Sequence, residues 1–187
     1  MDKTEKVLVA LFLLSGAILR FYNFWDFSLS NDELSALARL NFNSFSELIH
    51  EGIKIDGHPP AAQVILWYVS KWFGNGVFAV RSPFVIAGVL TLWFLYKTAR
   101  VWIGKSGALL TIATYSTLIF PLLYSRIARP YALGMLFIAL STYFWIRIVK
   151  EQQSNRDYLF LAISLVLAAY SHYFAALVGA LLAIIGV

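Results

Sequence analysis

The sequence predicts an all-α fold, a polytopic bundle of helices that crosses a membrane several times. Of the 187 residues, 60% are hydrophobic and only 13% are charged, which would expose too much apolar surface in a soluble globule. The lysines and arginines gather between long apolar runs, as they do in the short loops of multi-span membrane proteins. The formal net charge of +5 therefore indicates membrane topology, and no nucleic-acid partner is expected.

The first apolar run predicts a membrane-spanning helix over residues 7–25. Lys3 and Lys6 precede it, which places the amino terminus in the cytoplasm. Near its far end, Arg20 is expected to extend its guanidinium group to the membrane surface. A cleaved signal peptide is the alternative, but no small-residue cleavage site follows the run.

The polar interval that follows, residues 26–78, is expected to form an outer loop along the membrane surface. Segments 30–33 (SNDE) and 44–47 (SFSE) fit the capping box, in which a serine and a glutamate three residues later satisfy each other's backbone amides. They predict the starts of two amphipathic juxtamembrane helices. The apolar run 59–73 is short for a membrane span. If it crossed the membrane, the next basic loop would lie outside, whereas a juxtamembrane position keeps all the short basic loops on the cytoplasmic side. A juxtamembrane position is therefore favoured for this run as well.

Further apolar runs predict spans at residues 79–102, 107–124, 131–149, 158–170 and 174–187. The basic turns between them then fall on the cytoplasmic side with the amino terminus. A break is expected at 171–173 (SHY), because one helix over the last stretch would be too long for a bilayer. Because the chain ends inside an apolar run, residues 1–187 are interpreted as the amino-terminal part of one transmembrane domain. The remaining spans would be missing or supplied by another chain.

This topology brings a distinctive set of polar side chains to the outer face. An arginine can clamp a departing phosphate group, and a carboxylate can take the proton from an attacking hydroxyl. A donor whose phosphate lies at the headgroup level of a lipid would reach such a site without leaving the membrane. The candidate site residues are Asp32, Glu33, Asp56, His58, Arg126, Arg129, Tyr131 and His172.

Several motifs follow one another in a characteristic order. They are NDE at 31–33, DGHPP at 56–60, AVRSP at 79–83, YSRIARPYAL at 124–133 and HYF at 172–174. In this order and topology they resemble the GT-C membrane glycosyltransferases of glycosyltransferase family 39. That family includes the protein O-mannosyltransferases and is related to the bacterial aminoarabinose transferase of lipid A.

The resemblance implies an inverting transfer of a sugar from a polyprenyl-phosphate donor to a hydroxyl group of a protein, lipid or glycan. The reaction would take place on the outer face of the cell (cytoplasmic or inner) membrane, in a multi-pass enzyme. Asp32 and Glu33 would be catalytic, with Asp32 the better candidate for the general base. Arg126, and after it Arg129, would bind the donor phosphate. The other outer residues, Asp56, His58, Tyr131 and His172, would contribute to substrate binding.

The candidates also have purely structural explanations. Glu33 is the third residue of a capping box, and His58 could simply separate two elements before its prolines. His172 could satisfy backbone groups at a helix break, and the two outer arginines could contact lipid headgroups. Arg81 is predicted to be an ordinary interfacial anchor.

The sequence supports no cofactor beyond the lipid donor. It contains no cysteine, and the candidate ligands of the outer loop, Asp32, Glu33, Asp56 and His58, include no pair four residues apart. A divalent ion would require the outer acids and histidine to meet by folding back of the loop. A transporter would need ionisable residues at mid-membrane depth, which are nearly absent. A non-catalytic membrane subunit or truncated remnant, binding lipid or a partner protein, stays as the alternative.

Overall fold

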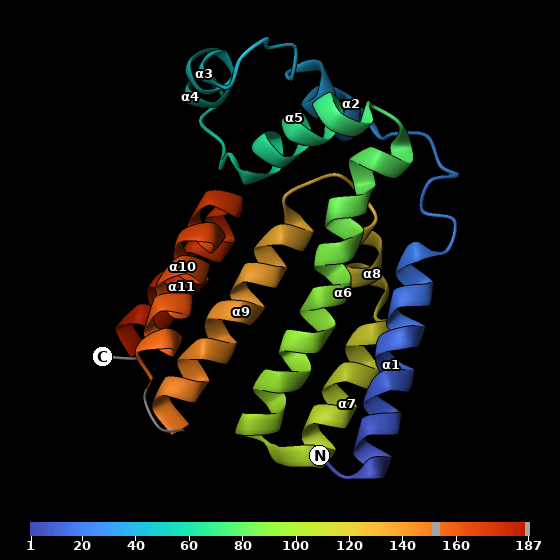
Figure 1. The fold of residues 1–187 in the computed structure, drawn as a ribbon, viewed down its shortest axis with the longest axis vertical. Helices are drawn as coiled ribbons and strands as arrows, with labels where there is room; N and C mark the ends of the chain where they lie inside the picture. The colour runs from blue at the N-terminus through green and yellow to red at the C-terminus, as the bar shows by residue number, and fades with distance from the viewer. Residues whose placement is uncertain (151–153, 186–187) are drawn as a thin grey trace.

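The computed structural model describes residues 1–150 and 154–185, and these residues form helices and no strand. A bundle of long helices runs along the molecule, and a layer of short helices covers one end of it (Figure 1). The predicted all-α membrane bundle is therefore confirmed. The bundle consists of α1 (Lys3–Phe21), α6 (Val77–Trp102), α7 (Gly104–Thr117), α8 (Ile119–Ser125), α9 (Tyr131–Lys150), α10 (Asn155–Ser171) and α11 (Tyr173–Ile185).

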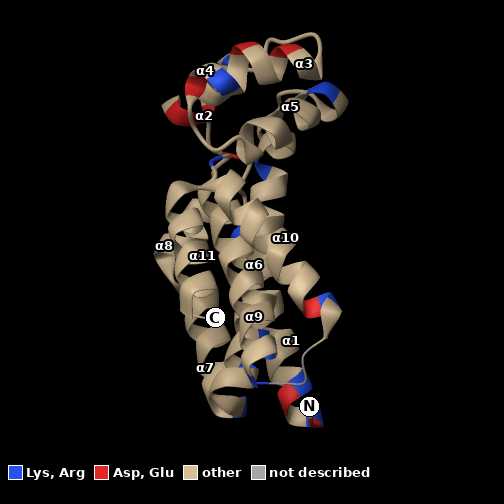
Figure 2. Cartoon of the chain, turned by 90° about the vertical axis from the view of Figure 1, so that its left-hand side faces the viewer, with Lys and Arg blue, Asp and Glu red and all other residues tan. Residues whose placement is uncertain are grey.

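Length and hydropathy allow α6 and α9 each to cross a membrane, and α7 with α8 would make a third span if the bent pair is counted as one. Charged residues gather towards the two ends of the molecule and are sparse along the helices between them (Figure 2). This distribution fits a bundle whose middle lies in hydrocarbon, where a charge is costly.

The span predicted at residues 107–124 is not one straight helix. Helix α7 ends at Thr117, and α8 continues at an angle of 60°. Pro121 explains the break, because proline donates no backbone hydrogen bond and its ring clashes with the carbonyl four residues earlier, here that of Thr117. The bend turns α8 across the end of the bundle and places the connection to α9 beneath the outer layer.

The outer layer contains α2 (Asn31–Ala38), α3 (Phe45–Glu47), the π-helical turn η1 (Leu48–Ile53), α4 (Lys54–Asp56) and α5 (Ala61–Phe73). Both predicted helix starts are confirmed. The hydroxyls of Ser30 and Ser44 accept hydrogen bonds from the amides of Glu33 and Glu47, at 3.3 and 3.2 Å. The Glu33 carboxylate also accepts from the Ser30 amide at 2.8 Å, which completes the first capping box.

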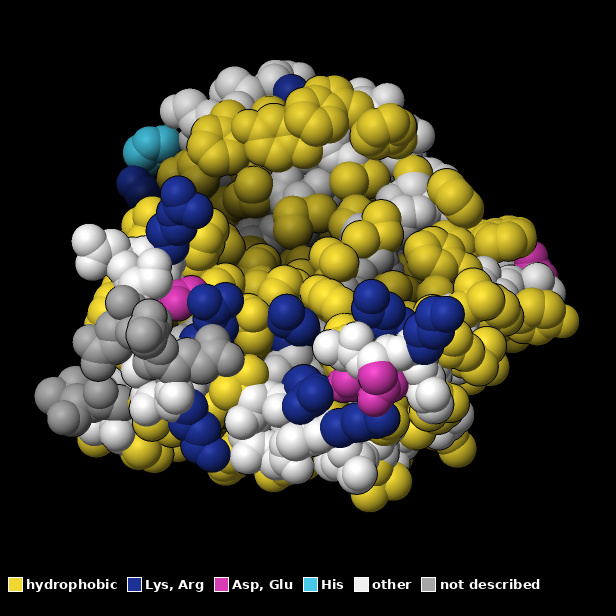
Figure 3. Space-filling view, turned by 60° about the horizontal axis from the view of Figure 1, so that its bottom comes forward, with side chains coloured by type: hydrophobic (Ala, Val, Ile, Leu, Met, Phe, Trp, Pro, Cys, Tyr) yellow, Lys and Arg dark blue, Asp and Glu magenta, His cyan; other side chains and the backbone are white. Residues whose placement is uncertain are grey.

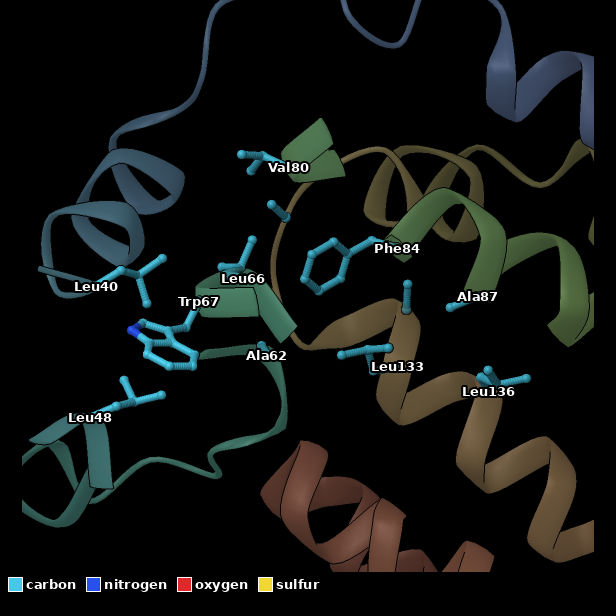
Figure 4. Packing of buried hydrophobic residues seen from close by; sticks show 12 residues of the cluster. Leu40, Leu48, Ala62, Leu66, Trp67, Val80, Phe84, Ala87, Leu133 and Leu136 are labelled. Carbon is cyan, nitrogen blue, oxygen red and sulfur yellow. The ribbon is translucent and has the colours of Figure 1, made fainter. Parts of the chain in front are cut away.

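A hydrophobic core fastens the outer layer to the bundle. Leu66 and Trp67 of α5 pack with Phe84 of α6 and Leu133 of α9 (Figure 4). The Trp67 indole also donates a hydrogen bond to the Phe42 carbonyl at 3.2 Å. The outer layer is thus packed against the ends of the helices, and its side chains are held at fixed places above them.

Arg20 does not extend to the membrane surface as predicted. Its side chain is completely buried inside the bundle. The guanidinium donates to the carbonyls of Gly16 and Ser116 at 3.1 and 3.2 Å, and to that of Tyr115 at 3.4 Å. Tyr115 and Ser116 lie in the last turn of α7, where the bend removes the helical partners of the carbonyls. Arg20 therefore caps the broken end of α7, a role that no local pattern in α1 reveals.

Replacing Arg20 by methionine is expected to lower the thermal stability of the detergent-purified protein. The change leaves the carbonyls of Tyr115 and Ser116 buried without a donor, at a cost of about 1–3 kcal/mol for each unpaired group. Ile18→Met, at an exposed position of the same helix, is the matched control and should leave the unfolding temperature unchanged. Equal unfolding temperatures for the Arg20 variant and the wild type would contradict the capping role.

Candidate functional site

A buried ion pair joins α2 to α6. Arg81 donates from Nε and Nη2 to the two carboxylate oxygens of Glu33, each at 2.8 Å. Glu33 is fully buried and Arg81 is 4% exposed. Such a two-pronged contact fixes the relative orientation of both side chains, because the planar guanidinium matches the planar carboxylate.

The same ion pair holds the neighbouring connections. Arg81 donates further to the carbonyls of Phe24, Phe27 and Ser28, at 2.9, 3.0 and 3.0 Å, in the segment between α1 and α2. On the opposite side, Glu33 accepts from the backbone amide of Ala128 at 2.8 Å, in the connection between α8 and α9. The prediction of an interfacial anchor at Arg81 is thus wrong, because these buried acceptors hold its guanidinium inside the protein.

The environment of Glu33 keeps its carboxylate ionised. Burial by itself raises the pKa of this group, but hydrogen bonds from Arg81 and from the backbone amides of Ala128 and Ser30 lower the pKa to about 2. A carboxylate with this pKa, whose oxygens already accept several hydrogen bonds, is a weak proton acceptor at neutral pH. The geometry therefore favours a structural role for Glu33 over the predicted catalytic one.

A cavity of about 470 Å³ lies between the outer layer and the ends of α9, α10 and α11. Several predicted site residues line it although they come from distant parts of the chain. They are Asp56, His58, Arg129, Tyr131 and His172. Asp56 ends α4 and His58 lies in the connection from α4 to α5. Arg129 precedes α9 and Tyr131 begins it, whereas His172 lies in the break between α10 and α11.

The two outer arginines take different positions. Arg129 lines the cavity, and its Nη1 donates to the backbone carbonyl of Asp32 at 3.4 Å. Its Nε is buried and has no hydrogen-bond partner among the described residues. Arg126 is not among the residues that line the cavity, and it donates to the Tyr22 carbonyl at 2.7 Å. Neither arginine forms an ion pair with a described carboxylate. The geometry thus favours Arg129, the second of the two predicted phosphate-binding residues.

Asp32 lies at the edge of this cavity. It is exposed in the first turn of α2, and its carboxylate accepts no hydrogen bond from the described residues. Asp32 itself is not a lining residue, but Ala36, one helical turn further on the same face, is. Its backbone contact with Arg129 places the predicted base beside the predicted phosphate-binding residue.

Asp56 and His58 form a polar corner of the cavity. Asp56 makes an ion pair with Arg39 of the outer layer. His58 Nδ1 lies 3.3 Å from an Asp56 carboxylate oxygen and 3.0 Å from the Asp56 carbonyl. The Tyr173 hydroxyl donates a hydrogen bond to the carbonyl of Gly57. The loop from α4 to α5 is thus tied to the start of α11.

A second, apolar cavity of about 230 Å³ continues from the first into the bundle. Tyr131, His172 and Phe174 line both cavities and form their common wall. The rings of Tyr131 and His172 lie 5.6 Å apart. Beyond this wall the apolar cavity is lined by residues such as Phe120, Met135 and Ile138. The sequence patterns do not predict this cavity, because the bend between α7 and α8 creates one of its sides.

The described residues contain no group of three or more histidine, aspartate, glutamate or cysteine side chains that could hold a metal ion. Glu33 points into its ion pair with Arg81, whereas Asp56 and His58 contact each other in the lining of the cavity. The outer acids and histidine therefore do not converge on one point.

Comparison with known proteins relates the chain to a known family. A family model described as dolichyl-phosphate-mannose-protein mannosyltransferase matches residues 57–186. The matched range includes the cavity residues from His58 to Phe174 and begins after Asp32 and Glu33. No curated protein and no solved structure matches the chain.

Proposed function

Because the chain belongs to the dolichyl-phosphate-mannose-protein mannosyltransferase family, we propose that it transfers a sugar from a polyprenyl-phosphate donor to a hydroxyl group of an acceptor. Family membership gives the general class, a membrane glycosyltransferase of the mannosyltransferase type. The identity of the donor, the mechanism and the role of each residue are inferred from the site.

The observation that carries this proposal is the pair of cavities with a common wall. A polyprenyl-phosphate sugar has a polar head and a long apolar chain. The larger cavity contains charged and polar side chains and would accept the sugar and phosphate. The apolar cavity, reached past Tyr131, His172 and Phe174, would accept the first isoprene units.

Arg129 is the proposed phosphate-binding residue. It lines the cavity, and no described carboxylate neutralises its charge, so that the guanidinium remains available for a phosphate. Guanidinium groups bind phosphate through parallel charge-assisted hydrogen bonds. Such bonds would also stabilise the negative charge that develops on the phosphate as the glycosidic bond breaks.

Asp32 is the proposed general base. The acceptor oxygen would form a bond to the anomeric carbon while the bond from that carbon to the phosphate oxygen breaks. The hydroxyl proton would pass to the Asp32 carboxylate, and the bonding electrons would leave with the polyprenyl phosphate. Attack from the face opposite the phosphate inverts the anomeric configuration. Glu33 and Arg81 would hold α2, and with it Asp32, next to Arg129.

We place this reaction at the outer face of the cell (cytoplasmic or inner) membrane, with a protein, lipid or glycan as the acceptor. A second candidate is a membrane subunit that binds the lipid or a partner protein without catalysis. It is favoured by one observation, the position of Asp32 outside the cavity lining. A further chain that completes the bundle would be compatible with either function.

Reconstitution tests the proposal directly. The protein would be incorporated into liposomes with dolichyl-phosphate mannose radiolabelled in the sugar, together with a membrane extract that supplies acceptors. We expect label to pass from the lipid into an acceptor fraction. Binding of the labelled lipid without transfer, in the presence of the extract, would instead support the non-catalytic subunit.

Replacing Arg129 by glutamine is expected to weaken binding of the labelled donor about 10- to 100-fold, because a hydrogen bond to a charged group contributes about 1.5–3 kcal/mol. Binding would be measured as labelled lipid retained by the purified protein. Arg126→Gln is the matched control, since Arg126 does not line the cavity, and it should bind the donor nearly as well as the wild type. A larger effect at Arg126 than at Arg129 would reverse the assignment.

A further inference from the structure

The end of the bundle opposite the outer layer is rich in basic side chains, several of which have partners. Arg100 forms an ion pair with Glu5, Lys105 with Asp2, and Arg147 with Asp157. Lys150 donates to the carbonyl of Trp102 at 3.4 Å. Lys97 of α6 differs from these residues. It is half-buried, and no carboxylate or hydrogen-bond acceptor of the described residues contacts its ammonium group.

Lys97 is held between aromatic rings instead. Its Nζ lies 5.6 Å from the ring centre of Trp93 and 5.6 Å from that of Tyr143 on α9. The guanidinium of Arg147 lies 5.7 Å from the same Tyr143 ring. Two cations thus approach one ring from neighbouring helices. Asp157 already pairs with Arg147, so Lys97 is the cation beside this ring that no described carboxylate neutralises, and in these apolar surroundings an added anion would be attracted to it.

The surroundings of these cations are apolar. Figure 3 shows lysine and arginine side chains along the edge of an apolar hollow in the surface. Aromatic side chains continue from Tyr143, with ring centres 5.8 Å away at Phe94 and 5.2 Å away at Phe144. A ligand that satisfies both the charge and the apolar surface must therefore be an amphiphile with an anionic head.

We propose that Lys97 binds the phosphate of an anionic phospholipid whose acyl chains lie against the neighbouring aromatic side chains. The lysine ammonium acts as a point charge with donors for the phosphate oxygens, and the aromatic side chains around Tyr143 provide the contact for the chains. Free phosphate matches the charge but leaves these aromatic side chains uncovered. This site is separate from the two cavities of the proposed transferase site and does not depend on that function.

Native mass spectrometry of the detergent-purified protein tests the proposal. The protein would be titrated with phosphatidylglycerol, with phosphatidylcholine of the same acyl chains, and with inorganic phosphate. We expect phosphatidylglycerol to bind more tightly than the other two. Lys97→Gln should weaken phosphatidylglycerol binding about fivefold, the contribution of roughly one basic residue near a charged lipid surface, whereas Lys97→Arg should retain it. Lys105→Gln is the matched control, because Asp2 already pairs with Lys105.

Several outcomes would overturn the assignment. Unchanged binding in Lys97→Gln would exclude Lys97, and an equal loss in Lys105→Gln would indicate a general effect of surface charge. Equal binding of inorganic phosphate would indicate an anion site without a lipid. A second measurement leaves Lys97 unchanged and therefore tests the proposal even if the Lys97 variant fails to fold. Phosphatidylglycerol with brominated acyl chains should quench the fluorescence of Trp93 more than brominated phosphatidylcholine, and Trp93→Phe should lose the difference. Equal quenching in the wild type would refute the proposal.

Discussion

Replacement of Asp32 by asparagine is expected to lower sugar transfer about 10²- to 10⁴-fold, the usual contribution of a general base. The amide has nearly the same size as the carboxylate but cannot accept the proton of the acceptor hydroxyl. Donor binding should stay unchanged, because Arg129 contacts Asp32 through the backbone carbonyl and not through the carboxylate. Initial rates of label transfer and retention of the labelled donor, measured on one preparation, separate the two effects.

Asp26→Asn is the matched control for this variant. Asp26 is another exposed acid in the connection between α1 and α2, and its carboxylate has no partner among the described residues. It should transfer sugar at the wild-type rate. Transfer by Asp32→Asn at that same rate would exclude Asp32 as the base. A joint loss of transfer and donor binding would show that Asp32 supports the cavity and takes no proton.

The parts of the molecule that the sequence predicts depend on local signals. Composition and the long apolar runs predict the helical membrane bundle, and serine–glutamate spacing predicts the starts of α2 and α3. The approach of Asp32 to Arg129 follows from topology, because alternating crossings bring both segments to one face. In the structure these residues are in contact, although 97 positions separate them in the chain.

The parts that the sequence could not predict depend on long-range partners. Arg20 and Arg81 both lie beside an apolar run, where arginine commonly reaches the membrane surface. Both are buried instead, because partners 96 and 48 positions away in the chain accept their hydrogen bonds. The same reasoning applies to Glu33, whose capping box is visible in the sequence while its ion pair with Arg81 is not.

The ion pair between Glu33 and Arg81 is expected to make the largest single contribution to the stability of the site. Arg81→Met should destabilise the folded protein by about 3–5 kcal/mol, because it leaves the Glu33 carboxylate charged and buried without its partner. Glu33→Gln should destabilise the folded protein by a similar amount, because it leaves the Arg81 guanidinium charged and buried without its carboxylate. Unfolding in detergent, followed by tryptophan fluorescence, measures both. The double variant should be more stable than the sum of the two losses predicts, because no unpaired charge remains.

The pH dependence of unfolding tests the same ion pair without changing its geometry. The pKa of Glu33 is about 2 in the folded protein, against 4.5 for an ordinary glutamate. A lowered folded-state pKa stabilises the protein above the unfolded-state value, and this stabilisation is lost as the pH falls from about 4.5 towards 2. The difference corresponds to about 3 kcal/mol. Glu33→Gln removes the titrating group, so its stability should fall less steeply over that range than that of the wild type. Parallel pH profiles for the two proteins would mean that Glu33 is not held as a buried anion. Contacts other than the ion pair between Glu33 and Arg81 would then have to hold Asp32 next to Arg129.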